Sequence, residues 1–373
     1  MNVEHSVLHR YSQGALERQE ALCCPVEYDR DLLQQLPAEI VEKDYGCGDP
    51  SRYVRVGDTV LDLGSGGGKV CYIAAQRVGE HGRVIGVDMN DDMLNLARKY
   101  QPEMARRLGG DRVRFLKGYI QDLALDVKAM ERYLQAHPVC DLKSLSALNA
   151  WQTEQRRARP LISDDSVDVV ISNCVLNLVD DAHKTQLFRE IFRVVKPGGR
   201  VAISDIISDE PVPAEFKADA ELWSGCIAGA FQEQHFLNSF VDAGFAGVTV
   251  DHWSAEPWQV IQGIEFRAVT VTAVKGYGTE CVDRGQAVVY RGPFAEIRDE
   301  EGHVFPRGER IAVCARTFRF LTEGPYRSHF IGIAPRILGA PRAWCAPPGT
   351  RRHAAETKGG KQIADSGDGV CCC

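Results

Sequence analysis

Residues 59–71, TVLDLGSGGGKVC, contain the pattern that decides the fold of this chain. The apolar run at its start predicts a β-strand, the four glycines that follow predict a tight loop, and the last residues predict a helix with Cys71 in its first turn. Glycine lets the backbone turn sharply and approach a ligand closely, and the N–H groups at the start of the helix face that ligand. The stretch therefore predicts a nucleotide-binding loop.

A second apolar strand, residues 84–87, ends at Asp88, about twenty residues beyond the last glycine of the loop. A nucleotide-binding fold places a carboxylate at this point to bind ribose hydroxyls. Asp62 precedes the glycines, and an acidic loop suits a cofactor with a cationic amino acid part better than one with a pyrophosphate. S-adenosylmethionine is such a cofactor, because it carries an ammonium, a sulfonium and a ribose but no phosphate. The segment resembles the first motif of the class I S-adenosylmethionine-dependent methyltransferases.

Strands alternate with helices from residue 59 to about residue 274, which predicts an α/β fold. The expected architecture is the Rossmann-like, mostly parallel sheet of class I methyltransferases, with helices on both faces. No clear helical pattern separates the last two strands, residues 248–251 and 268–274, so an antiparallel pair at one edge is expected. Short strands and turns farther on, including residues 310–314 and 317–321, predict a small β-rich C-terminal domain.

The chain of 373 residues is therefore divided into four parts. The parts are an N-terminal helical lid segment with Cys23, Cys24 and Cys47 (1–54), a methyltransferase domain with an insertion at about 125–162 (55–275), the β-rich domain (276–335), and a tail expected to be disordered that ends in three cysteines (336–373).

The composition excludes several classes of partner. A formal net charge of −7 gives no general attraction to nucleic acid or to anionic membranes. No apolar run is long enough to span a bilayer, and the N-terminus is polar without an apolar signal core. We expect a cytoplasmic protein, a monomer, without nucleic acid or membrane partners.

Four cysteines fall near the edge of the sheet where ligands bind, beyond the carboxyl ends of the strands. Cys174 follows the fourth strand, Cys71 lies after the first, Cys226 lies in the connection after the fifth, and Cys47 lies in a glycine-flanked turn before the first. A single cysteine is more often a small buried apolar residue than a ligand, but several converging on one edge reverse that preference. Three thiolates suit trivalent arsenic, whose lone pair stays free to act as a nucleophile.

At these residues the chain resembles the arsenite S-adenosylmethionine methyltransferases. The matching segments are residues 45–48, 62–66, 71–72, 172–175 and 222–226. The resemblance implies that Cys174 and Cys226 hold As(III), that Cys47 is a third or exchanging thiolate, and that Cys71 is the disulfide partner of Cys47. It also implies that trivalent arsenicals are the substrate and that thioredoxin or glutathione is the external thiol reductant. Either Cys23 or Cys24 matches a further cysteine of the family.

The resemblance also assigns cofactor contacts. Asp62, Gly64, Ser65 and Gly66 are expected around the methionine part of S-adenosylmethionine, Asp88 at the ribose and Met89 at the adenine. Gln121 and Asp122 match an adenine-contacting position, although Asp122 alone fits a helix N-cap equally well. Asn173 is expected on the floor of the cleft beside Cys174.

The insertion and the C-terminal half depart from the family pattern. A weaker resemblance is to a branch associated with arsenosugar synthesis, and the number of methyl groups added stays open. One alternative function is methylation of an organic small molecule, which would need a general base, for which His183 and His235 are the nearby candidates. The other is a non-enzymatic thiol protein that binds arsenic or a metal, and the cofactor motifs count against it.

Overall fold

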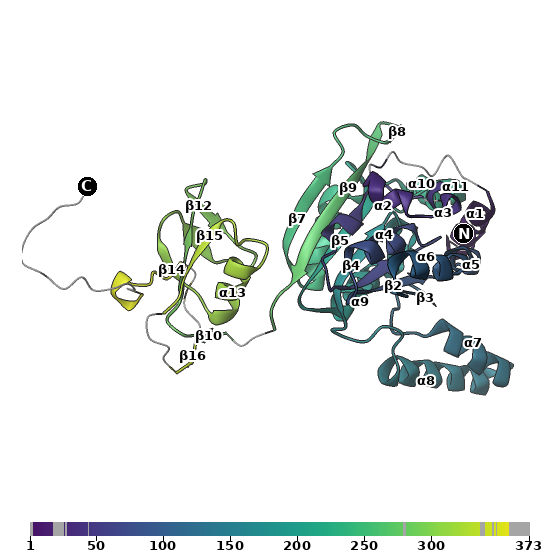
Figure 1. The fold of residues 1–373 in the computed structure, drawn as a ribbon, viewed down its shortest axis with the longest axis horizontal. Helices are drawn as coiled ribbons and strands as arrows, with labels where there is room; N and C mark the ends of the chain where they lie inside the picture. The colour runs from purple at the N-terminus through teal and green to yellow at the C-terminus, as the bar shows by residue number, and fades with distance from the viewer. Residues whose placement is uncertain are drawn as a thin grey trace, which may run out of the picture. The chain divides into compact units, whose positions relative to one another are not determined.

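The computed structural model describes residues 3–17, 26, 28–43, 45–278, 281–335, 340–344, 347 and 349–357. The chain divides into two compact units, with the boundary along the sequence between Lys275 and Gly276, and both are shown in Figure 1. The predictions for Cys23, Cys24 and the three C-terminal cysteines fall on residues outside the described part.

The first unit is built on one mixed sheet of order β3-β2-β1-β4-β5-β9-β7, with β6 beside β5 and β8 beside β9. Pairing is parallel from β3 to β5 and antiparallel for β5–β9 and β7–β9. The predicted mostly parallel sheet with an antiparallel edge is confirmed. The strands are β1 (Thr59–Leu63), β2 (Arg83–Asp88), β3 (Val113–Lys117), β4 (Val167–Asn173), β5 (Val195–Ser208), β6 (Phe231–Gln232), β7 (Phe245–Trp253), β8 (Gln259–Ile261) and β9 (Ile264–Lys275).

Helices cover both faces of this sheet (Figure 1). Successive residues of a strand point to opposite faces, so Val60 packs in the core on the α4 side and Leu61 in the core on the α9 side. The helices of the unit are α1 (Val3–Leu16), α2 (Arg30–Gln34), α3 (Ala38–Glu42), α4 (Lys69–Arg77), α5 (Asp91–Lys99), α6 (Gln101–Leu108), α7 (Val127–Ala136), α8 (Leu142–Ala158), α9 (Asp181–Val194), α10 (Ala214–Lys217), α11 (Ala220–Ser224) and α12 (Glu233–Ala243). Short 3-10 turns are η2 (Pro50–Tyr53) and η3 (Leu176–Leu178).

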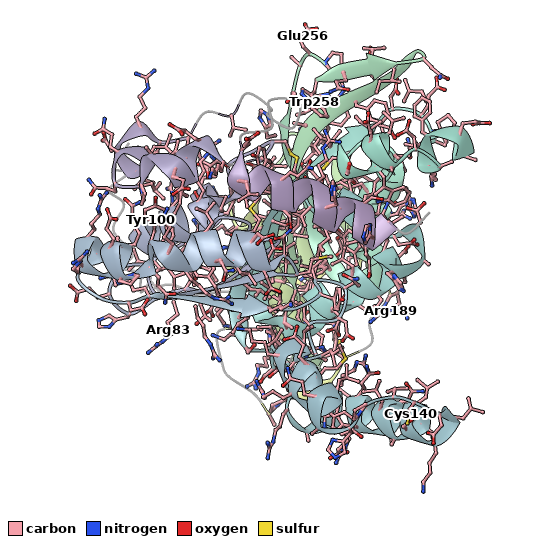
Figure 2. The ribbon with its side chains drawn as sticks, turned by 90° about the vertical axis from the view of Figure 1, so that its right-hand side faces the viewer. Arg83, Tyr100, Cys140, Arg189, Glu256 and Trp258 are labelled. Atoms are coloured by element: carbon pink, nitrogen blue, oxygen red, sulfur yellow. A yellow bond between two sulfur atoms is a disulfide. The ribbon has the colours of Figure 1, made fainter. Side chains whose placement is uncertain are left out.

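The insertion consists of α7 and α8, which project from the body of the unit (Figure 1). Tyr133 and Trp151 stack between the two helices with ring centroids 4.7 Å apart. Figure 2 shows Cys140 on this projecting part of the chain.

In the second unit, β11 (Ala287–Tyr290) lies between β14 (Arg310–Ala312) and β15 (Phe330–Ile333) in an antiparallel sheet. Two short pairs accompany it, β12 (Glu296–Arg298) with β13 (Val304–Pro306) and β10 (Val282–Asp283) with β16 (Arg342–Ala343). The remaining elements are α13 (Ala315–Glu323) and the 3-10 turn η4 (Ala354–Glu356).

Two predictions for this unit are wrong. Residues 317–321 form part of α13 rather than a strand, because the sulfur of Cys314 caps the helix by accepting a hydrogen bond from the backbone N–H of Thr317. The described residues after 335 are not disordered throughout, since β16 pairs with β10 and Arg352 forms an ion pair with Asp283 at 2.6 Å.

Candidate active site

A cavity lies beyond the carboxyl ends of β1, β2 and β4. The glycine loop after β1, the end of β2 and the segment after β4 all contribute to its wall, as expected for ligands of an open parallel sheet. Nine of the residues predicted for the site line this cavity: Asp62, Gly64, Ser65, Gly66, Asp88, Met89, Gln121, Asn173 and Cys174.

The glycine loop is held open toward the cavity. Asp88 accepts hydrogen bonds from the backbone N–H groups of Gly66 and Asn90, each at 2.8 Å, and desolvation raises the pKa of its carboxyl group. A Cβ atom at Gly66 would meet no atom within 4 Å, whereas one at Gly64 would overlap the side chain of Val175. Gly64 therefore lets the cofactor loop approach the segment that carries Cys174.

The side chain of Ser65 indicates what kind of ligand this loop fits. Its hydroxyl oxygen is buried and has no hydrogen-bond partner among the described residues. A buried polar group normally has a partner, so the loop fits a ligand with polar groups of its own. The acidic pair Asp62 and Asp88 fits a ligand that carries positive charge and hydroxyl groups.

Cys71 lies behind the loop, on α4. It is fully buried, and its thiol donates a hydrogen bond to the carboxylate of Asp62 at 3.1 Å. Burial raises the pKa of Cys71 well above its ordinary value, and the negative charges of Asp62 and Asp88 raise it further. These effects favour the protonated thiol in this arrangement, in which Cys71 holds the carboxylate of Asp62.

Helix α1 covers the cavity and lies in front of the sheet in Figure 2. It contributes Glu4, Val7, Leu8 and Tyr11 to the cavity wall. Contacts with three separate segments hold it there. The amide of Asn90 donates to the backbone oxygen of Leu8, Tyr45 donates to Gly14, and Arg10 donates to Glu221.

Cys47 and Cys174 are joined by a disulfide, with their Cα atoms 5.8 Å apart. The predicted pairing of Cys47 with Cys71 is wrong for this structure. The reason is Asn173, whose side-chain oxygen accepts hydrogen bonds from the backbone N–H groups of Cys47 (2.9 Å) and Gly48 (3.1 Å). These bonds hold the loop of Cys47 directly beside Cys174, while Cys71 is enclosed in the core.

Asn173 lines the cavity as expected, but its amide serves the protein. Its nitrogen donates to the backbone oxygen of Gly48 at 2.8 Å and to the hydroxyl of Tyr28 at 2.9 Å. A Cβ atom at Gly46 would overlap this amide, so the glycine before Cys47 is needed for the loop to reach Asn173.

Cys226 completes the group of sulfur atoms. Its thiol donates to the backbone oxygen of Cys174 at 3.4 Å, and the hydroxyl of Tyr11 forms a hydrogen bond with its side chain. Desolvation first, and then Cys226, raise the pKa of Tyr11. Cys47, Cys174 and Cys226 share one apolar cluster with Trp223 and other buried side chains. Among the described residues, no three His, Cys, Asp or Glu side chains are grouped to hold a metal ion, and two of these sulfurs are bonded to each other.

Both Cys174 (φ 58°) and Cys226 (φ 63°) have left-handed backbone conformations. Side chains other than glycine rarely adopt this conformation, and such strained residues gather at functional sites because the surrounding structure enforces them.

Two residues that the sequence reasoning missed enforce this geometry. The amide of Asn177 donates to the backbone oxygens of Ile206 (2.6 Å) and Cys226 (3.3 Å). The buried carboxyl of Asp205 accepts from the N–H groups of Leu176 and Ile206 at 2.9 and 2.8 Å. Burial raises the pKa of Asp205 to about 7. One signal was available, since the strand pattern of residues 200–205 ends at Asp205 just as that of residues 84–87 ends at Asp88.

Asp122 is not part of the cavity wall. Its carboxylate forms an ion pair with Arg156 of α8 at 2.9 Å, so it anchors the insertion. Asp122 is not a helix N-cap, since that position before α7 is taken by Asp126, and its contact with adenine stays a prediction. Gln121 does line the cavity, where its amide donates to Glu4 of α1 at 3.4 Å.

Comparison with known proteins identifies the family to which this chain belongs. Residues 55–136 and 148–244 match a family described as a methyltransferase domain, and residues 278–362 match a domain of unknown function. An arsenite methyltransferase of Aquipseudomonas alcaligenes is 32% identical over 354 residues, which cover 88% of this chain and 89% of the relative. The chain belongs to the arsenite methyltransferase family. A mouse arsenite methyltransferase is 30% identical over 345 residues, covering 89% of this chain and 80% of its own length.

A solved structure agrees with this membership. The crystal structure of an arsenic(III) S-adenosylmethionine methyltransferase from Chlamydomonas reinhardtii has 28% identity and a TM-score of 0.55, covering 87% of this chain and all of that chain. In the present chain, the match to the methyltransferase domain is interrupted at residues 137–147, which lie at the tip of the insertion. None of the helices in the described part of the chain is long and apolar enough to cross a membrane.

Proposed function

We propose that this protein transfers a methyl group from S-adenosylmethionine to trivalent arsenic held by the thiolates of Cys174 and Cys226, with Cys47 as a third thiolate after reduction of its disulfide. The observation that carries the proposal is the arrangement of three cysteines from remote parts of the chain, in which Cys47 is bonded to Cys174 and both share one apolar cluster with Cys226. Cys174 lines the cavity, and the Cys226 thiol reaches the Cys174 backbone at 3.4 Å.

The residues of the cavity fit the cofactor. Asp62 would bind the ammonium group, Ser65 and Gly66 the rest of the methionine part, and Asp88 the ribose. In support, all four residues line the cavity, and the hydroxyl of Ser65 has no partner among the described residues. Met89 and Gln121 also line the cavity and would contact the adenine. When bound, S-adenosylmethionine supplies a methyl group on a positively charged sulfur.

The thiolates supply position and a dry environment. Three sulfur ligands leave the arsenic lone pair on the open side, and the apolar cluster around them keeps water away. The lone pair forms the new As–C bond as the C–S bond of the sulfonium breaks, and arsenic passes from the trivalent to the pentavalent state. Holding the two reacting atoms in line removes most of the entropic cost of their encounter.

The disulfide between Cys47 and Cys174 fits the second half of the cycle. Two thiolates that form a disulfide release two electrons, which return pentavalent arsenic to the trivalent state. An external thiol, thioredoxin or glutathione, then reopens the disulfide and restores the arsenic site. We propose that the enzyme acts as a monomer and in the cytoplasm, where such reductants are available.

One assay tests the proposal. The purified protein is incubated with As(III), S-adenosylmethionine and glutathione, and the methylated arsenic species are separated and quantified. Cys174→Ser and Cys226→Ser are each expected to abolish methylation. Cys140→Ser is the matched control, because Cys140 is exposed on the insertion, and it should methylate at the rate of the original protein. Normal turnover of the Cys174 variant would reject the assignment.

Methylation of an organic small molecule is less well supported. It would need a general base in the cavity and would survive loss of the cysteines. His183 and His235 are both exposed on helices, and neither belongs to the cavity wall.

A further inference from the structure

The C-terminal unit contains a second pair of cysteines, which the reaction above does not use. Cys314 is the N-cap of α13, where its sulfur lies 3.2 Å from the hydroxyl of Thr317. Cys281 precedes β10, and its thiol donates to the backbone oxygen of Trp344 at 3.2 Å. The side chain of Cys281 is also hydrogen-bonded to the sulfur of Cys314. The two sulfurs are therefore neighbours, and neither belongs to a disulfide.

The pair combines an accessible thiol with an acidic one. Cys281 is exposed, whereas Cys314 is 3% exposed. Burial works to raise the pKa of Cys314, but hydrogen bonds from Thr317 and Cys281 and the positive charge of Arg316 outweigh it and lower the pKa. A thiol with a lowered pKa provides more thiolate, which is the form that binds soft metalloids.

We propose that Cys281 and Cys314 form a dithiol site for a trivalent arsenical that carries one organic group. Such an arsenical has two valences left, and two sulfurs fill them. Inorganic As(III) would require a third donor, and the described residues contain no group of three His, Cys, Asp or Glu side chains suited to a metal ion. The choice of ligand rests on the proposed function, because the reduced, singly methylated product is an arsenical of this class.

The binding step is an exchange of ligands without a change in oxidation state. The exposed Cys281 forms the first As–S bond, and Cys314 forms the second. Two As–O bonds break, and the two oxygens leave as water with the protons of the two thiols. No oxidant or reductant is required, so the step is independent of S-adenosylmethionine.

Phenylarsine oxide, an arsenical with one organic group, is the probe. Two equivalents, one for the site of Cys47, Cys174 and Cys226 and one for this pair, are added to the reduced full-length protein without S-adenosylmethionine, the remaining thiols are alkylated, and the peptides are analysed by mass spectrometry. We expect one arsenic atom to join the peptides of Cys281 and Cys314, and alkylation of Cys281 to slow about tenfold or more, which corresponds to about 1.4 kcal/mol. Cys140 is the matched exposed control and should be alkylated at an unchanged rate.

Two variants make the test decisive. Cys281→Ser should leave Cys314 without arsenic, and Cys314→Ser should do the same for Cys281 while keeping a good helix cap. The Cys174→Ser variant, which is expected not to methylate arsenic, should still form the bridge, so failure of one proposal does not imply failure of the other. Arsenic on single cysteines only, or equal alkylation of Cys281 with and without the probe, would overturn the dithiol site.

Discussion

Replacing Asn173 with alanine should release the loop that carries Cys47 from its place beside Cys174. The side chain of Asn173 makes four hydrogen bonds, of which three go to the backbone of Cys47 and Gly48 and one goes to the hydroxyl of Tyr28. Alanine removes all four and leaves room in their place. Bringing the two sulfurs together would then cost the conformational entropy of ordering the loop, and these hydrogen bonds would no longer offset that cost.

The size of the effect follows from these contacts. A neutral hydrogen bond contributes about 0.5–1.5 kcal/mol net, so four contribute roughly 2–6 kcal/mol. A loss at the lower limit of this range reduces the equilibrium constant for disulfide formation between Cys47 and Cys174 about 30-fold, because each 1.4 kcal/mol corresponds to a factor of ten.

The assay equilibrates the protein in glutathione buffers of graded redox ratio, traps free thiols by alkylation and quantifies Cys47 by mass spectrometry. Asn149→Ala is the matched control, because Asn149 is exposed on α8, and it should leave the equilibrium unchanged. If the Asn173 variant formed the disulfide at the same redox ratio as the original protein, the loop would be positioned by something other than this amide, and the reasoning would be refuted.

Three further predictions concern the same site. Gly46→Ala should sharply reduce arsenic methylation, because its Cβ atom would overlap the asparagine that holds the loop, whereas Gly110→Ala, with no atom within 4 Å, should be neutral in the same assay. Burial raises the pKa of Asp205 to about 7, above its ordinary 3.8, so the folded state retains a proton that the unfolded state has lost. Between about pH 4 and pH 7 the unfolding free energy should therefore fall as the pH rises, and urea titrations should show a flatter profile for Asp205→Asn. Tyr11→Phe removes a hydrogen bond to Cys226 and should weaken As(III) binding to the reduced protein about tenfold, which calorimetry would measure; unchanged affinity would contradict the contact.

The sequence by itself determined the fold of the first unit. The strand, glycine loop and helix of residues 59–71 and the acidic end of β2 are local patterns. Such patterns can be recognised from neighbouring residues alone, without knowing which distant segments they contact. The same reasoning failed at residues 317–321, where the alternating pattern suits a strand. There the sulfur of Cys314 caps a helix instead, and Phe318 and Leu321 turn toward the core of the second unit.

Only the tertiary structure decided which cysteines meet. Cys47 and Cys174 are 127 positions apart, and their pairing depends on the amide of Asn173, which no local pattern reveals. In the same way, Asp122 forms an ion pair with Arg156 of the insertion. Cys281 lies beside Cys314 because β10 pairs with β16 and Cys314 caps α13. The type and order of the elements follow from short-range periodicity, but the partner of each polar side chain is set by packing between distant segments.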